Sequence, residues 1–316
     1  MFKGCFGTPR QKYLYVVLPY FNFAGFKRRR ELFIKFVNWL DGCAGVRAIV
    51  SEALGPLELP PDLPVWRHTK RTVESRIWLK ENLINLAIRD LPPDWEHVAW
   101  VDADVTFLNA NWVADTIKAL GRADVVQMWQ TAVNFGPNCE ALKIDKSFAY
   151  MAKGSGTPWT PNDRYGHWHP GYAWACTKKA WVKMNGLIDW AILGSGDRHM
   201  AMALVGLALQ SAPGNINENY KILLKNFQKS CQGLTLSWIP GTIIHHWHGT
   251  FANRRYRERW EILTKNNFDP LKDIHIWPDG RVALTRSGLR LVPELDDYFL
   301  GRKEDDVVWT SGSRTG

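Results

Sequence analysis

The stretch HVAWVDADV, residues 97–105, indicates the fold of this chain more directly than any other part of it. Its first five residues form a short apolar run, which predicts a buried β-strand. Two carboxylates, Asp102 and Asp104, follow this run at once. In open α/β sheets, ligands bind beyond the carboxyl ends of the strands. The stretch therefore predicts a strand that ends at a binding site.

Strand-like and helix-like segments alternate on both sides of this stretch. The apolar patterns predict strands at 13–20, 46–50 and 123–129, and helices at 28–40, 72–89 and 111–120. Later segments are less regular, with a strand and a helix over 171–184, a helix over 198–209, a strand at 242–246 and a basic amphipathic helix over 254–264. This alternation is typical of an α/β fold, Rossmann-like, with a mostly parallel central sheet flanked by helices.

The composition is that of a folded globular protein. Of the 316 residues, 46% are hydrophobic and 22% are charged, which excludes a largely disordered chain. No apolar run approaches the roughly 20 residues that a membrane helix needs. The five cysteines are scattered and contain no C-x-x-C pair, and the first residues lack the pattern of a secretory signal. We therefore expect a cytoplasmic protein with no membrane partner.

The positive charge and the tryptophans are both unusual. The net charge is +9, and residues 1–30 contain seven basic residues and no acidic one. Such a local excess favours an anionic partner, namely nucleic acid, nucleotide phosphates or an acidic glycan, although a solvated basic face would give the same pattern. The 17 tryptophans either fill the core or stack on sugars and bases.

Three short motifs contain residues suited to catalysis. The first is Asp102-Ala103-Asp104, whose carboxylates could share Mg²⁺ or Mn²⁺ with a diphosphate or could simply cap the strand end. The second is the group His245, His246 and His248, which could complete a metal site, bind zinc or be ordinary buried histidines. The third precedes a helix and ends in Asp197, which could be a general base or a helix N-cap.

Aromatic and basic residues surround these motifs in the sequence. Gly171 and Tyr172 begin a strand that also carries Trp174, so an aromatic ring there either lies under a sugar or base or packs in the core. Arg254 and Arg255 could contact phosphates. Interleaved acids make a salt-bridged solvent face the alternative for these arginines.

The order of these motifs resembles the GT-A glycosyltransferases, and the galactosyltransferases of that fold in particular. The same segments are similar to phage and bacterial proteins of this class, and the resemblance covers roughly residues 12–280. The segments that carry it are WLKENLINLAIRDLP (78–92), VAWVDADVTFLNANW (98–112), HPGYAWACTKKAW (169–181), GSGDRHMAMAL (194–204) and HHWHGTFANRRYRERWEIL (245–263). It implies a GT-A catalytic domain over residues 1–250, with a nucleotide-sugar half at about 12–130 and an acceptor half at about 131–250. A C-terminal basic helix and extension, 251–316, would follow.

The resemblance also implies a role for each matching residue. Asp102 would contact the donor's ribose or sugar, and Asp104 would bind the metal with His248, or with His245 or His246 in its place. Asp197 would be the base of an inverting reaction, although Arg198 follows it where the galactosyltransferases have consecutive acids. The donor would be a nucleotide sugar, with a UDP-sugar as the first choice, and the metal Mn²⁺ or Mg²⁺. Further donor contacts would come from Pro19, Tyr20, Asn22, Gly171 and Tyr172.

The basic residues and the phage-like resemblance favour DNA as the acceptor. The specific expectation is a 5-hydroxymethylpyrimidine base, such as 5-hydroxymethylcytosine in bacteriophage DNA, whose hydroxyl receives a hexose or pentose. A viral or bacterial glycan or a protein is the alternative acceptor, and a non-catalytic sugar- or DNA-binding module is the alternative outside enzymes. The expected acceptor or phosphate contacts are Arg28, Arg29, Arg30, Trp168, Trp174, Arg254 and Arg255.

Overall fold

The computed structural model describes residues 13–154 and 168–306 and contains a central seven-stranded sheet. The strand order is β11 (Leu236–Trp238), β6 (Val125–Gln127), β10 (Ala173–Thr177), β4 (His97–Val101), β1 (Leu14–Tyr20), β2 (Val46–Ala53) and β3 (Arg67–Arg71). Only β10 runs antiparallel to its neighbours. These strands confirm the predicted α/β fold with a mostly parallel central sheet.

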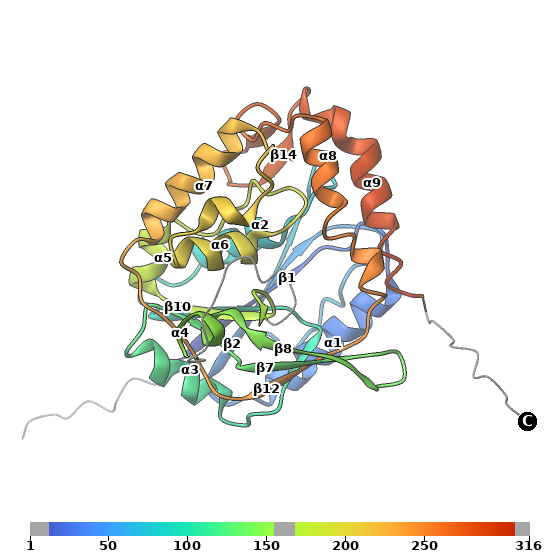
Figure 1. The fold of residues 1–316 in the computed structure, drawn as a ribbon. Helices are drawn as coiled ribbons and strands as arrows, with labels where there is room; N and C mark the ends of the chain where they lie inside the picture. The colour runs from blue at the N-terminus through green and yellow to red at the C-terminus, as the bar shows by residue number, and fades with distance from the viewer. Residues whose placement is uncertain (1–12, 155–167, 307–316) are drawn as a thin grey trace, which may run out of the picture.

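A second sheet of five short strands lies beside the first (Figure 1). Its order is β5 (Val105–Phe107), β12 (Thr242–His245), β7 (Thr131–Phe135), β8 (Ala141–Ser147) and β9 (Trp168–His169). The pairing of β12 with β5 brings the end of β12 next to the Asp102–Asp104 turn, because His245 lies opposite Val105. A hairpin of β13 (Ile274–Ile276) and β14 (Val282–Leu284) forms the third sheet.

Helices cover both faces of the central sheet, because alternate residues of its strands are apolar on each side. One hydrophobic cluster includes Val17 and Trp100, and the other includes Val16 and Val101. The first contains residues of α2 (Lys80–Arg89), α5 (Lys178–Met184), α6 (Gly196–Leu204), α7 (Glu218–Cys231), α8 (Arg259–Lys265) and α9 (Val292–Leu300). The second contains residues of α1 (Lys27–Asp41) and α3 (Trp112–Leu120).

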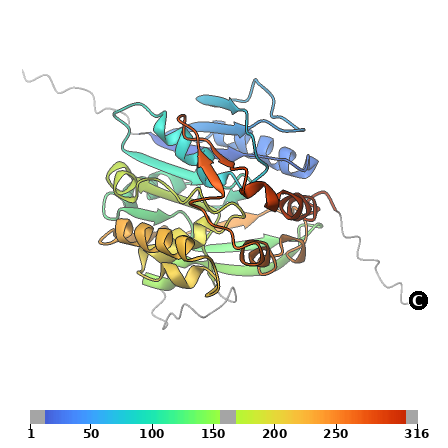
Figure 2. The same ribbon diagram turned by 90° about the horizontal axis from the view of Figure 1, so that it is seen from above.

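The C-terminal helices pack on the same core as the rest of the chain. Leu295 and Phe299 of α9 belong to one buried cluster with Val17 of β1. Figure 2 shows α8 and α9 close together, and Figure 1 shows them on one side of the molecule with α7 on the other. No helix in the described ranges is both long and apolar enough to span a bilayer.

Some of the predicted elements have different bounds. The helix expected over 72–89 begins only at Lys80, and residues 72–79 connect it to the strand β3 without regular structure. The Trp78 amide donates a hydrogen bond to the carbonyl of Ile192, a tertiary contact that helical periodicity cannot anticipate. The helix expected from 254 begins at Arg259, after a 3-10 turn at Ala252–Arg254. Further elements that were not predicted include β5, β7, β8, β9, β11, β13, β14, α4 (Phe148–Lys153), α7, α9 and the short 3-10 turns Ala208–Ser211 and Gly288–Leu291.

Candidate active site

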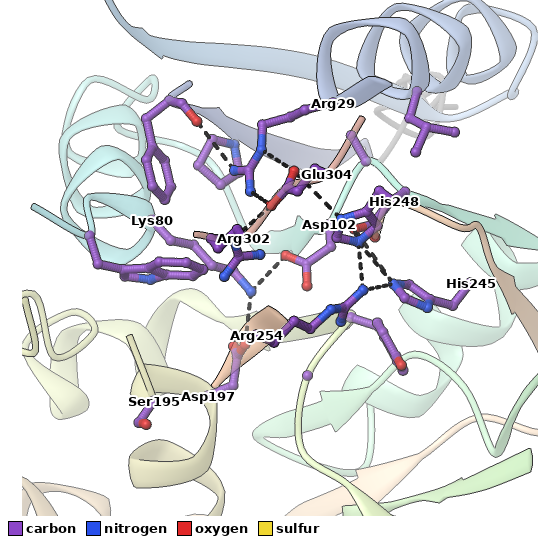
Figure 3. A pocket seen from close by; sticks show the side chains of 18 of the residues that line it. Arg29, Lys80, Asp102, Ser195, Asp197, His245, His248, Arg254, Arg302 and Glu304 are labelled. Atoms are coloured by element: carbon purple, nitrogen blue, oxygen red, sulfur yellow. Dashed lines mark hydrogen bonds and ion pairs between the residues drawn. The ribbon is translucent and has the colours of Figure 1, made fainter. Parts of the chain in front are cut away.

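A cavity of about 190 Å³ opens beyond the carboxyl ends of β1 and β4. Its walls come from many places in the chain: the end of β1, α1, the beginning of α2, the Asp102–Asp104 turn, the turn before β10, the beginning of α6, the segment from the end of β12 to α8 and the segment after α9. Figure 3 shows the side chains from these segments pointing toward one another. Segments more than 200 residues apart in the sequence therefore form a single pocket.

Asp104, His245 and His248 form a cluster with the spacing of a metal site. One potential ligand atom from each lies within 4.8 Å of the others. The Asp104 Oδ2 atom is 2.9 Å from His248 Nε2 and 3.7 Å from His245 Nε2. Burial would raise the pKa of the Asp104 carboxyl, but the two imidazoles lower it well below its usual range. Burial also lowers the pKa of His245 to about 4, which keeps this ring neutral and able to bind a cation.

These residues fit a divalent cation in chemistry as well as in spacing. A carboxylate and two imidazoles are donors that Mn²⁺ accepts, whereas Mg²⁺ prefers oxygen ligands alone. The second oxygen of Asp104, Oδ1, is buried and accepts no hydrogen bond within the described ranges. His246 lies outside the cluster, because its Nε2 is 2.8 Å from the Thr106 hydroxyl.

A guanidinium group lies against the two imidazoles of this cluster. Arg254 Nη2 is 2.9 Å from His248 Nε2 and 3.4 Å from His245 Nε2. The Arg254 side chain is buried, and its Nη1 atom donates a hydrogen bond to the Tyr256 hydroxyl at 3.2 Å. Figure 3 shows it between the imidazoles and Lys80.

Lys80 forms ion pairs with both Asp102 and Asp197, which belong to different sequence motifs. Its Nζ is 2.6 Å from Asp102 Oδ1 and 2.8 Å from Asp197 Oδ2. Burial would lower the pKa of Lys80, but the two carboxylates raise it, so this side chain is a permanent cation. Burial raises the pKa of Asp102 to about 6 against the opposing effect of Lys80. Sequence reasoning missed Lys80, because a lysine in an amphipathic helix is usually exposed.

Asp197 lies in the first turn of α6 and faces the cavity. The helix N-cap is Ser195, in a left-handed conformation (φ +78°), so Asp197 does not have the N-cap role considered above. A second acid, Glu81 of α2, lies directly against Gly196, and a Cβ atom there would collide with its carboxyl group. Burial, followed by the charge of Asp197, raises the pKa of Glu81 to about 8. Two acids thus adjoin at this turn, although they are far apart in the sequence.

The backbone of the turn before β10 lies close to both Asp102 and Asp197. Tyr172 has a left-handed backbone (φ +77°), and its carbonyl accepts a 2.7 Å hydrogen bond from the Asp102 amide. Its ring stacks on His169 at 4.2 Å between centroids, and its hydroxyl donates to Asn134. A Cβ atom at Gly171 would lie 2.9 Å from the His169 ring and 3.4 Å from Asp197 Oδ2. The absence of a side chain at Gly171 therefore leaves the space in front of Asp197 open.

The segment after α9 closes another side of the cavity. Glu304 is buried and accepts hydrogen bonds from Arg29 Nε at 2.8 Å and Arg302 Nε at 2.7 Å. Burial would raise the pKa of Glu304, but the two guanidiniums lower it well below its usual range. Its Oε2 is also 3.6 Å from His248 Nδ1, so Glu304 helps to orient the His248 imidazole, one of the three candidate metal ligands.

The structure brings most of the expected site residues together. Those that line the cavity are Pro19, Tyr20, Arg29, Asp102, Asp104, Gly171, Tyr172, Asp197, His245, His248 and Arg254. Asn22 is buried behind it, where its side chain holds the Phe26 backbone.

The expected acceptor contacts are more dispersed. Trp168 and Trp174 are only 1% and 0% exposed and belong to the hydrophobic core. Arg28 and Arg30 bond to the carbonyls of Trp247 and Glu58, and Arg255 pairs with Asp297. Residues 1–12, which contain part of the basic excess near the N-terminus, lie outside the described residues.

Comparison with known proteins gives matches in structure only. No protein-family model matches the chain, and no curated protein matches it in sequence. The chain aligns with the catalytic domain of Drosophila beta1,4galactosyltransferase 7 in complex with xylobiose (12% identity, 90% of this chain and 99% of the other, TM-score 0.39). It also aligns with the mannosyltransferase PcManGT from Pyrobaculum calidifontis in complex with GDP-Man and Mn²⁺ (16% identity, 82% and 62%, TM-score 0.43). A third alignment is with glucosyl-3-phosphoglycerate synthase from Mycobacterium tuberculosis in complex with Mn²⁺, UDP-glucose and phosphoglyceric acid (12% identity, 82% and 78%, TM-score 0.39).

Proposed function

We propose that this protein is a metal-dependent glycosyltransferase that moves a sugar from a nucleotide-sugar donor to a hydroxyl group. The observation that carries the proposal is the arrangement of two functional groups around one cavity. The candidate metal ligands Asp104, His245 and His248 lie on one side, and the candidate base Asp197 lies on the other, with Lys80 and Asp102 between them. A transferase needs a charge-neutralising group for the leaving diphosphate and a base for the acceptor, and this cavity offers both.

Asp104, His245 and His248 would hold the divalent cation, with Mn²⁺ favoured over Mg²⁺ by the imidazole ligands. The cation would supply positive charge to the diphosphate as it leaves. The protein adds charge of its own. Arg254 and Arg259 line the cavity, and both are buried. Neither forms an ion pair with a carboxylate in the part of the chain that the structure describes. Buried guanidiniums of this kind favour a phosphate-bearing ligand.

Asp197 would accept the proton of the acceptor hydroxyl. The hydroxyl oxygen forms a bond to the anomeric carbon of the donor sugar, the bond from that carbon to the diphosphate breaks, and its electron pair leaves with the diphosphate. Attack opposite the leaving group inverts the anomeric centre. Two features support this role. Lys80 holds the Asp197 carboxylate in place, and Gly171, which has no side chain, leaves space in front of that carboxylate.

For the acceptor, we propose a 5-hydroxymethylpyrimidine base in DNA as the first candidate. The excess of basic residues near the N-terminus and the uncompensated guanidiniums in the cavity support an anionic acceptor. Trp168 and Trp174 are no part of this proposal, because both are buried in the core. A glycan or protein acceptor is the alternative.

The test is a mass-spectrometric assay. The protein is incubated with Mn²⁺, a panel of nucleotide sugars and DNA that contains 5-hydroxymethylcytosine or 5-hydroxymethyluracil, and the nucleosides are then weighed. We expect a hexose or pentose mass on the modified base with wild type and with the exposed control Asp62→Asn, and none with Asp104→Asn or Asp197→Asn. Added mass on a glycan or protein alone would refute the DNA acceptor. The absence of both transfer and metal-dependent donor hydrolysis would refute the transferase itself.

Salt separates the two acceptor classes. A protein that grips DNA phosphates releases counterions on binding, so its apparent affinity falls steeply between 50 and 200 mM salt, by about a thousandfold or more for six contacts. An uncharged glycan acceptor shows no such slope. A fluorescence anisotropy titration of the modified DNA at several salt concentrations measures this difference.

A further inference from the structure

The Arg254 guanidinium lies against the two imidazole nitrogens that would bind a metal together with Asp104. Its Nη2 donates to His248 Nε2 at 2.9 Å and approaches His245 Nε2 at 3.4 Å. These are the same two nitrogens that complete the cluster with Asp104 Oδ2. An imidazole nitrogen has one lone pair, so it cannot accept this hydrogen bond and ligate a cation at the same time. The hydrogen bond from Arg254 to His248 and a metal bond to the same nitrogen therefore exclude each other; Figure 3 shows Arg254 beside His245 and His248.

Charge strengthens the exclusion. The cluster contains a single carboxylate, and the guanidinium supplies one positive charge beside it in a buried setting. A divalent cation close to a buried guanidinium would be repelled, since like charges interact strongly where water is excluded. The side chain would have to withdraw before the cation could bind.

The surroundings of Arg254 allow such a withdrawal. Besides the imidazoles, the guanidinium is held by the Tyr256 hydroxyl at 3.2 Å and lies 5.3 Å from the centre of the Phe251 ring. Its Nε atom has no hydrogen-bond partner in the described ranges. The short segment around it is bracketed by two residues in left-handed conformations, Gly249 (φ +89°) and Arg255 (φ +44°).

We propose that Arg254 is the resident cation of the Asp104–His245–His248 cluster and that a divalent metal binds only by displacing it. This inference rests on the proposed function, which assigns the metal to these residues. The displaced guanidinium stays within the cavity, where Arg29 and Arg302 also lie, and is then free to contact the donor's diphosphate. Metal binding and donor binding are thereby coupled through one side chain, and by linkage each strengthens the other.

The test is Mn²⁺ binding without nucleotide, measured from the free Mn²⁺ signal in electron paramagnetic resonance. The variants are Arg254→Met, the exposed control Arg257→Met and the ligand variant Asp104→Asn. We expect Arg254→Met to bind Mn²⁺ about tenfold more tightly than wild type, because a competing like charge has been removed. Arg257→Met should match wild type, and Asp104→Asn should lose binding. Equal or weaker binding by Arg254→Met overturns the proposal.

Hydrogen exchange of the wild-type protein gives a measurement that needs no variant. Adding Mn²⁺ should increase amide exchange over residues 250–256 if Arg254 is released, and unchanged or decreased exchange there contradicts the proposal. Donor turnover separates this inference from the proposed function. Turnover that persists in EDTA would overturn the Arg254 proposal but leave the protein a transferase. Tighter Mn²⁺ binding by Arg254→Met without any donor turnover would support the Arg254 proposal and overturn the proposed function.

Discussion

Lys80 is the residue whose replacement tests most of the site geometry at once. Its buried ammonium lies within 2.8 Å of carboxylate oxygens from both Asp102 and Asp197. Lys80→Met removes the cation and keeps a side chain of similar length. The two carboxylates, less than about 6 Å apart, would then face each other with an interaction of about 3 kcal/mol at an effective dielectric constant of 20.

We expect Lys80→Met to lower the free energy of unfolding at pH 7 by about 3–5 kcal/mol, the usual cost of removing one partner of a buried ion pair. Because the repulsion needs both carboxylates, the same substitution should cost about 2–3 kcal/mol less in an Asp197→Asn background. Denaturant unfolding followed by tryptophan fluorescence gives all four free energies of this double-mutant cycle. The exposed Lys265→Met, whose side chain is 72% exposed, is the control.

Two results would refute this reasoning. If Lys80→Met unfolds within about 0.5 kcal/mol of wild type, as Lys265→Met should, the Lys80 ammonium does not compensate the two acids. If it costs the same with and without Asp197→Asn, the two carboxylates do not share it.

Three further predictions concern neighbouring residues. Glu81→Gln should gain stability relative to wild type as the pH rises from about 4.5 to about 8, by on the order of a few kcal/mol. Over this range the unfolded wild type ionises Glu81, while the folded wild type, in which burial raises the pKa of Glu81 to about 8, keeps the proton, so wild type loses stability and the glutamine variant does not. Unfolding at pH 5 and pH 8 measures this. Gly171→Ala should fold but lose donor turnover, because its Cβ would crowd His169 and the space before Asp197; circular dichroism and turnover together test it. Glu304→Gln should lower the free energy of unfolding by about 3–5 kcal/mol at pH 7. Because the pKa of Glu304 is lowered in the folded protein, this difference from wild type should shrink as the pH falls below about 4.5. Unfolding curves at a series of pH values measure it.

Each of these has an outcome that contradicts it. A Glu81→Gln advantage that is independent of pH would mean that Glu81 is not a neutral acid in the folded protein. Full activity of Gly171→Ala would mean that the space in front of Asp197 is not used by a substrate. A Glu304→Gln cost that persists at low pH would assign the effect to packing and not to the charges of Arg29 and Arg302.

The local part of the site could be predicted from the sequence. The apolar run 97–101 followed by Asp102 and Asp104 marks the end of a central strand, and β4 ends there. The strand before His245 and the helix beginning near Asp197 were likewise found from short-range patterns. Period-two and helical spacings are properties of neighbouring residues, so they can be read without knowing how distant segments pack.

The tryptophans show where such patterns stop being informative. Trp100, Trp129 and Trp174 are fully buried, and none of them lines the cavity. An aromatic residue in a strand has the same local signature whether its ring meets a ligand or the core. Which of the two it meets depends on the elements that pack above it.

By itself, the sequence determined the α/β class, the strand that carries Asp102 and Asp104, and the candidate acids and histidines, because these follow from local periodicity and residue chemistry. Only the tertiary structure decided that Lys80 bridges two acids, that Arg254 lies among the imidazoles and that Glu304 reaches His248 from the end of the chain. These contacts join residues between 6 and 117 positions apart. Their energies come from burial and from charges brought together on folding, and no short stretch of sequence contains either.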